Sequence, residues 1–212
     1  MSAPTGITPE FFYSGMNINE YINGMTKNRE LFEENYRTFE MDGEEVAAFR
    51  EVEQPTHVLV LTEDWCGDAM RYLPALVRLA ETAQRWDVRI FYRDAHPDLA
   101  ERWLKQGKHR AIPVLVFLDE NWKEYACFVE KPALVYAEEL AARAIFADDN
   151  SDLPDAALPA GEMSQSTHDL FAPYMRGFRL ENTNRWQHLF ISELTQRMGS
   201  ATTSDAVGAG CW

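Results

Sequence analysis

The order of apolar and polar residues predicts alternating strands and helices in the middle of the chain. Four short apolar runs, rich in β-branched residues, are typical of buried strands: 57–62, 88–94, 114–119 and 123–129. Three stretches with apolar residues at helical spacing lie between and after them: 67–86, 99–105 and 133–146. Helical crossovers imply a parallel strand pair, and the last two strands form an antiparallel hairpin. We therefore expect an α/β fold with a central mixed β-sheet and flanking helices.

Residues 1–55 carry helix-start signals and predict a helical N-terminal extension. Thr8 precedes a proline, so a capping hydroxyl stands beside a residue that favours the first helical position. Asp42, with Glu45 three residues later, has the pattern of a capping box. A further helical stretch spans about residues 27–40.

The C-terminal part predicts a linker, a helical arm and a tail. Residues 147–167 are acidic, contain proline and lack periodicity, which favours a linker after a domain at 56–146. Within 168–198, apolar residues recur every four positions: Trp186, Phe190, Leu194 and Met198. Such an amphipathic helix needs an apolar partner. We expect this arm to pack on the N-terminal helices or on a second copy of the chain, forming a homodimer through the helical extensions, and we expect residues 199–212 to be a polar tail.

Composition narrows the classes of partner. The 212 residues include 34 acidic and 20 basic ones, for a formal charge of −14, which disfavours nucleic acid and anionic membranes as partners. The sequence has no apolar run long enough to span a membrane and no signal-peptide pattern, which predicts a cytoplasmic protein. Three scattered cysteines fit neither a disulfide framework nor a zinc cluster, so we predict no metal or cofactor.

The candidate chemistry lies in the stretch "TEDWCGDA", between the first strand and the next helix. Cys66 stands at the N-terminus of that helix, where unpaired backbone N–H groups stabilise a thiolate. Asp68 and the pair Glu63-Asp64 add negative charge, which opposes ionisation of the thiol. We expect the balance to be a modest lowering of the Cys66 pKa.

These residues and the order of elements resemble the thioredoxin superfamily, whose Trp-Cys-x-x-Cys motif occupies the same junction. Trp65 and Cys66 match its tryptophan and nucleophilic cysteine, whereas Ala69 stands at the position of the second cysteine. Pro74 matches the proline of the family's first helix, and Pro113 matches its cis-proline. The likeness covers about residues 56–146 and favours a bacterial thioredoxin-like group with a helical N-terminal extension.

One departure from the family pattern agrees with the missing second sulfur. Thioredoxins carry a buried aspartate six residues before the nucleophile, and this chain has Val60 there. The resemblance therefore implies a monothiol oxidoreductase, in which Cys66 takes the small-thiol half of a mixed disulfide and a second small thiol releases it. Its substrates would be a protein disulfide or a low-molecular-weight thiol or disulfide.

The resemblance also assigns roles to residues near the cysteine. The backbone of Ile112, beside Pro113, would align the substrate as an extra strand. Three consecutive residues that are basic or can become so would hold the carboxylates of a glutathione-like or bacillithiol-like thiol: Lys108, His109 and Arg110. Asp68 would accept a proton from the incoming thiol, and Trp65 would shield the sulfur. Each role has a simpler alternative. The basic residues would form a solvated loop, the Asp68 carboxylate would only cap the helix, and the Trp65 ring would only pack.

Other functions fit the same sequence. In the main alternative, Cys66 is a vestige and the chain is a redox-inactive module that holds peptides or proteins at the cis-proline surface. In a third reading, Cys66 senses peroxide by forming a sulfenic acid, with Thr62 as the supporting hydroxyl. Cys127 lies in an apolar strand and suits the core, and Cys211 in the tail is the candidate for a second, resolving thiol.

Overall fold

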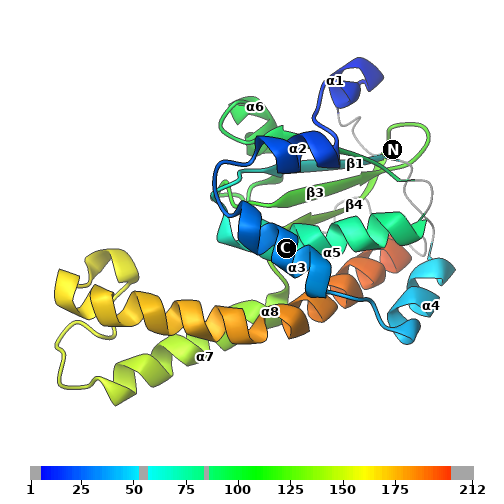
Figure 1. The fold of residues 1–212 in the computed structure, drawn as a ribbon. Coiled ribbons are helices and arrows are strands. Elements are labelled where there is room, and N and C mark those ends of the chain that lie inside the picture. The colour runs from blue at the N-terminus through cyan, green and yellow to red at the C-terminus, as the bar shows by residue number, and fades with distance from the viewer. Residues whose placement is uncertain (1–5, 53–56, 84–85, 202–212) are drawn as a thin grey trace. The chain divides into compact units, whose positions relative to one another are not determined.

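A computed structural model describes residues 6–52, 57–83 and 86–201 (Figure 1). The chain divides into two compact units. The first comprises Met1–Lys131 together with Gln187–Trp212, and the second comprises Pro132–Trp186. Helix α8 (Gln165–Ala201) supplies residues to both units.

The first unit is built around a four-stranded mixed sheet in the order β2-β1-β3-β4. Its strands are β1 (His57–Thr62), β2 (Asp87–Tyr92), β3 (Val114–Leu118) and β4 (Glu124–Val129). β1 and β2 are parallel, whereas β3 pairs antiparallel with both β1 and β4. The expected mixed sheet is confirmed. Every residue of β1 and β3 is buried, because helices cover both faces of these central strands.

One face of the sheet packs against short helices: α1 (Pro9–Tyr13), α6 (Pro97–Ala100) and the 3₁₀ helix η1 (Glu101–Trp103). Leu59 and Leu61 contribute to this core together with Phe12 and Trp103. The helix expected at 99–105 is shorter than predicted and starts earlier. Its start follows Pro97, which suits a first helical position, and its end comes where Leu104 turns to an extended conformation.

The opposite face packs against α5 (Gly67–Ala83) and the C-terminal part of α8, and α3 (Arg29–Thr38) packs against α5. Phe190 of α8 lies with its ring 5.3 Å from Tyr72 of α5 and 5.1 Å from Phe128 of β4. Gln187 donates a hydrogen bond to the backbone carbonyl of Arg71 at 2.9 Å. The Trp186-to-Met198 stripe of the sequence is buried, as its spacing predicts.

Side-chain caps set the starts of the N-terminal helices. The Thr8 hydroxyl accepts from the Phe11 N–H at 3.2 Å, and Asp42 forms the expected capping box at the start of α4 (Gly43–Glu51). The sequence reading missed α2 (Ile18–Gly24), although Asn17 and Glu20 form an equivalent capping box there.

A short N-terminal segment covers the edge of the sheet. Met16 and Ile90 exchange backbone hydrogen bonds of 3.0 and 2.8 Å, which satisfies part of the exposed side of β2. The approach is close, because a Cβ atom added at Gly15 would lie 2.5 Å from the Phe91 ring. Glycine at this position is therefore a packing requirement.

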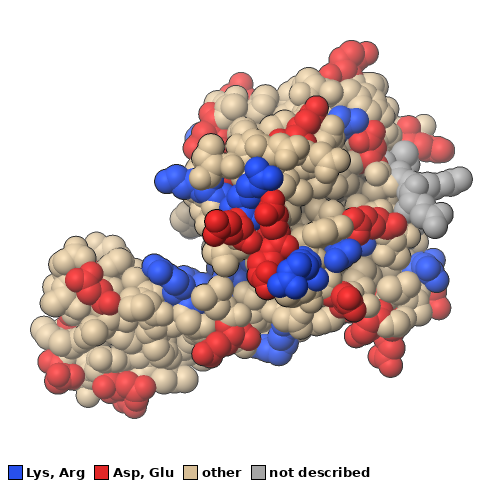
Figure 2. Space-filling model, in the orientation of Figure 1, with Lys and Arg blue, Asp and Glu red and all other residues tan. Residues whose placement is uncertain are grey.

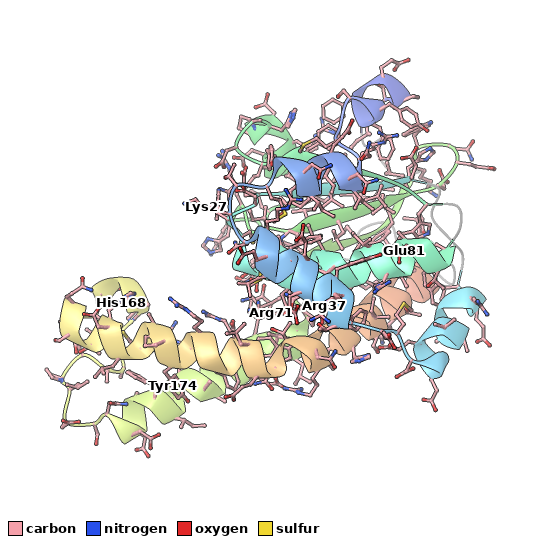
Figure 3. The ribbon with its side chains drawn as sticks, viewed as in Figure 1. Lys27, Arg37, Arg71, Glu81, His168 and Tyr174 are labelled. Carbon is pink, nitrogen blue, oxygen red and sulfur yellow. The ribbon has the colours of Figure 1, made fainter. Side chains whose placement is uncertain are left out.

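The second unit is helical. It contains α7 (Ala133–Asp149), the 3₁₀ helix η2 (Ala160–Glu162) and the part of α8 up to Trp186, so the stretch read as a linker contains the end of α7 and η2. Phe146 packs its ring 5.1 Å from Phe171. Tyr174, which Figure 3 labels on α8, donates to the Ala142 carbonyl at 3.1 Å. These contacts hold α7 against α8.

Two general properties of the described residues bear on partners. None of their helices is long and apolar enough to cross a membrane. Figure 2 shows acidic and basic side chains intermixed on the visible face of the first unit.

Candidate active site at Cys66

Cys66 lies where β1 ends and α5 begins. After Thr62 the chain makes a turn in which the Cys66 N–H donates to the Glu63 carbonyl at 3.2 Å. Helix α5 starts at Gly67, and the Cys66 sulfur accepts a hydrogen bond from the Ala69 N–H at 3.4 Å. The sulfur thus occupies the place of a capping acceptor at the helix N-terminus.

A backbone carbonyl from another segment faces the same sulfur. The Ile112–Pro113 peptide bond is cis, and the Cys66 thiol donates to the Ile112 carbonyl at 3.4 Å. Pro113 is held in turn, since its carbonyl accepts from the Glu130 N–H at 2.7 Å. The structure therefore brings together Cys66, Ile112 and Pro113, which the sequence reading had grouped.

The thiol is buried and does not ionise readily. The Cys66 residue is 7% exposed, and Cys66 is a free thiol. Burial raises its pKa to about 11; the Ala69 N–H opposes this rise, and the charges of Asp68 and Glu130 add to it. The expected modest lowering of the pKa is wrong, because the helix N-terminus offsets only part of the cost of removing a thiolate from water.

A charged network surrounds the first turn of α5. Asp68 pairs with Arg71 at 3.0 Å and with Lys131 at 3.1 Å. Both cations have little contact with solvent, with 3% of the Arg71 and 9% of the Lys131 side chain exposed. Glu130 lies 3.6 Å from Lys131 and pairs with Lys105 at 2.8 Å. Asp68 is thus a carboxylate held between two cations beside the sulfur.

The sequence reading missed most of this network. Arg71 carried a usable signal, because it lies one helical turn after Asp68 on the same face of α5. Lys131 and Glu130 carried none, since they approach only through the pairing of β4 with β3. Figure 3 labels Arg71 near the start of α5.

The basic cluster lies in an exposed loop. Lys108, His109 and Arg110 are all exposed. The Arg110 side chain pairs with Glu101, and the His109 carbonyl accepts from the Lys105 N–H at 2.8 Å in a tight turn. The geometry described for these residues therefore involves their own loop, and their role toward a small thiol stays a prediction.

The Trp65 ring is open to solvent, and its expected role in shielding the sulfur stays a prediction. It is 48% exposed, and the Arg93 guanidinium lies 5.1 Å from the centre of its ring. Arg93 also pairs with Asp94 at 2.8 Å and donates to the Arg110 carbonyl at 3.2 Å. An open aromatic surface thus lies next to Cys66 in sequence.

The two acidic residues before Trp65 anchor the loop. The Glu63 carboxylate accepts from the Asp94 N–H at 2.8 Å. The Asp64 carboxylate accepts from the Thr26 N–H at 2.7 Å and from the Lys27 N–H at 3.1 Å. Partial burial opposes ionisation of Asp64, but the hydrogen bonds from these neighbours prevail and lower its pKa. Both carboxylates therefore fix the position of the cysteine.

The fold and this single-cysteine junction define a thioredoxin-like protein. A profile of the thioredoxin family matches residues 15–158, which is 144 of the 212 residues. The chain belongs to that family.

Two solved structures share the fold. One is a protein of unknown function from Pseudomonas aeruginosa, 21% identical, with a TM-score of 0.54 over 86% of this chain and 94% of that one. The other is an HIV epitope-scaffold, 19% identical, with a TM-score of 0.53 over 87% of this chain and 96% of that one. No curated protein matches the sequence.

Proposed function

We propose that this protein is a thiol-disulfide oxidoreductase that works with one cysteine, Cys66, as its nucleophile. The observation that carries the proposal is the position of the sulfur. The sulfur accepts a hydrogen bond from the Ala69 N–H at 3.4 Å and lies 3.4 Å from the Ile112 carbonyl oxygen. It therefore lies between a helix N-terminus and the backbone segment beside Pro113. Both are groups that an incoming disulfide would meet.

The reaction would run in two exchanges. The Cys66 thiolate attacks a mixed disulfide between a substrate and a small thiol, forms a Cys66–small-thiol disulfide and releases the substrate sulfur as a thiol. A second small thiol then attacks that disulfide, regenerates Cys66 and leaves as the oxidised small-molecule disulfide. In sum, one mixed disulfide and one free small thiol become the substrate thiol and one small-molecule disulfide, so atoms and electrons balance.

Other residues take roles around these steps. Ile112 and Pro113 would bind the substrate backbone as an added strand. Asp68 would accept the proton of the second small thiol, and Lys108, His109 and Arg110 would hold its carboxylates. The exposed ring of Trp65 would contact the substrate. A reducing compartment such as the cytoplasm would supply the small thiol.

The high pKa limits the rate at neutral pH. At pH 7 a thiol with a pKa of about 11 is ionised roughly a hundredfold less than one at its ordinary value of 9.0. A thiolate of higher pKa is more nucleophilic, which recovers about tenfold of this loss. We expect a slow enzyme whose rate rises steeply toward alkaline pH.

The same observation supports a second candidate function. A protonated, buried thiol also suits a redox-inactive module that binds peptides or proteins along the segment at Pro113. In that case, replacing Cys66 by serine would leave partner binding unchanged and no disulfide exchange would be seen.

Incubation with glutathione disulfide distinguishes the monothiol oxidoreductase from the redox-inactive binding module. We expect the wild type to gain one glutathionyl group, located by peptide mass spectrometry on Cys66, and Cys66→Ser to gain none at that position. Cys211→Ser is the matched control and should keep the adduct; Cys211 lies outside the described residues. If only Cys211 is modified, the assignment of the active site is wrong.

A further inference from the structure

Two hydroxyl groups are buried at the end of the sheet where α5 begins. Tyr21 of α2 is 1% exposed and Thr62 of β1 is fully buried. Among the described residues neither hydroxyl oxygen has a well-aligned hydrogen-bond partner, although the Thr62 hydroxyl lies close enough to Tyr21 to favour its phenolate. Leaving a buried polar atom unsatisfied destabilises a fold, so two neighbouring cases at one site indicate a functional reason.

The geometry of the sheet places both groups on the side of Cys66. Leu59 and Leu61 point into the core formed with α1 and α6, so by alternation Thr62 points to the opposite face, which α5 covers. Thr62 pairs in register with Tyr92, and the Tyr21 ring lies 6.1 Å from that of Tyr92. The Tyr21 and Thr62 side chains therefore share the space beneath the start of α5.

The segment after α2 is fastened to the loop that carries Cys66. Thr26 donates both its N–H and its hydroxyl to Asp64, two residues before the cysteine, at 2.7 and 2.9 Å. Asn28 donates to the Asp64 carbonyl at 3.0 Å. These hydrogen bonds therefore hold the segment after α2 close to the active-site loop.

We propose that the Tyr21 hydroxyl, supported by Thr62, is a positioning group that donates a hydrogen bond, directly or through one buried water, to the Cys66 sulfur once it is ionised. This inference rests on the proposed function. The charged and titratable groups facing Cys66 come from several elements: Asp68 and Arg71 of α5, Glu130 and Lys131 after β4, and Tyr21 of α2. Tyr21 offers an uncharged donor among them. Burial raises the pKa of its phenol, and the charges of Tyr92, Asp64 and Cys66 add to this rise.

Val60 lies on the same face of β1 as Thr62 and offers no polar atom, so the hydroxyls are the polar groups that β1 and α2 bring to this place. A hydrogen bond to a charged sulfur is stronger than one to a neutral thiol. The Tyr21 hydroxyl would therefore favour the reactive thiolate of Cys66 over its protonated thiol.

The test is the rate of iodoacetamide alkylation at Cys66, followed from pH 7 to pH 11 in the wild type and in Tyr21→Phe. We expect alkylation of the variant to be about threefold slower at pH 8, because a tenfold loss of thiolate is partly offset by higher nucleophilicity. The slowing should shrink toward pH 11, where about half of the wild-type thiol is ionised. Thr62→Val should change the rate in the same direction by less.

Tyr92→Phe is the matched control, since it removes the hydroxyl of the adjacent tyrosine and should leave the profile unchanged. An unchanged profile in Tyr21→Phe would overturn the inference, and so would slowing by the same factor at pH 8 and at pH 11, which indicates altered access. If Tyr21→Phe does not fold, Thr62→Val decides by the same criterion. Absence of a glutathionyl adduct in the wild type would instead refute the proposed function, while the alkylation comparison would still stand.

Discussion

Replacement of Asp68 by asparagine tests how the site controls its sulfur. The carboxylate is one of the two charges that raise the Cys66 pKa, and it is held by Arg71 and Lys131 at 3.0 and 3.1 Å. Asparagine keeps the shape and the backbone N–H of the residue. The substitution removes a negative charge and leaves two buried cations near the sulfur, and both changes favour a thiolate.

The magnitude follows from the charges and their surroundings. Two charges about 5 Å apart interact by roughly 3 kcal/mol at an effective dielectric constant of 20, and the two cations screen part of this. We expect about a tenfold gain in thiolate at pH 8, and, after the loss of nucleophilicity, about threefold faster alkylation. Breaking the pairs of Asp68 should also destabilise the protein by roughly 3 kcal/mol.

The assay measures the rate of Cys66 alkylation in quenched time points and the free energy of unfolding of the same variant in urea. Asp94→Asn is the control, because that carboxylate pairs with Arg93 in the neighbouring loop, whereas the charges that chiefly raise the Cys66 pKa are those of Asp68 and Glu130. Glu130→Gln should act in the same direction as Asp68→Asn. Alkylation that is unchanged or slower in folded Asp68→Asn would refute the reasoning.

Asp68→Asn also separates the two exchange steps. If Asp68 accepts the proton of the second small thiol, attack on the substrate should become faster and release of Cys66 from its small-thiol disulfide should become slower. Accelerated release in this variant would exclude the proton-acceptor role and leave Asp68 as a group that only tunes the sulfur.

Three further predictions concern other parts of the molecule. Gly15→Ala should lower the free energy of unfolding by roughly 1–3 kcal/mol in urea, because its Cβ would meet the Phe91 ring at 2.5 Å; equal stability would show that the edge segment moves freely. Asp64→Asn should flatten the acid side of the stability curve. Because folding lowers the pKa of this carboxyl, its contribution is present above the unfolded value of about 3.9 and is lost as pH falls through the folded value, so an unaltered curve below pH 4 would contradict it. Phe146→Ala should cost the helical unit about 3–5 kcal/mol by calorimetry, with Cys66 alkylation unchanged; parallel loss of both would show that the units unfold together.

Much of the fold could be predicted because local patterns determine it. The strands are runs of buried apolar residues, and the helix starts at Thr8 and Asp42 carry side-chain caps that can be seen in the sequence. The antiparallel pairing of β3 with β1 could not be derived from periodicity, since an alternating order of strands and helices does not fix strand direction. Helix α2 was missed because its apolar content is low, although Asn17 and Glu20 marked its start.

The residues that meet at the site could be predicted from the sequence, but the pKa of Cys66 could not. Cys66, Ile112 and Pro113 could be grouped because each belongs to a motif or an element boundary. The ionisation of Cys66 depends on burial, which arises where the start of α5 meets the distant segment at Ile112. Glu63 and Asp64 illustrate the difference. In the sequence they are negative charges near a thiol, whereas in the structure their carboxylates accept hydrogen bonds from backbone N–H groups and fix the loop.

The most direct test of the central claim is turnover of a glutathionylated peptide by glutathione, measured as release of glutathione disulfide from pH 7 to pH 10. We expect a rate that depends on Cys66, is absent above background in Cys66→Ser, and rises nearly tenfold for each pH unit below the midpoint. A rate equal in the wild type and Cys66→Ser at every pH would contradict it.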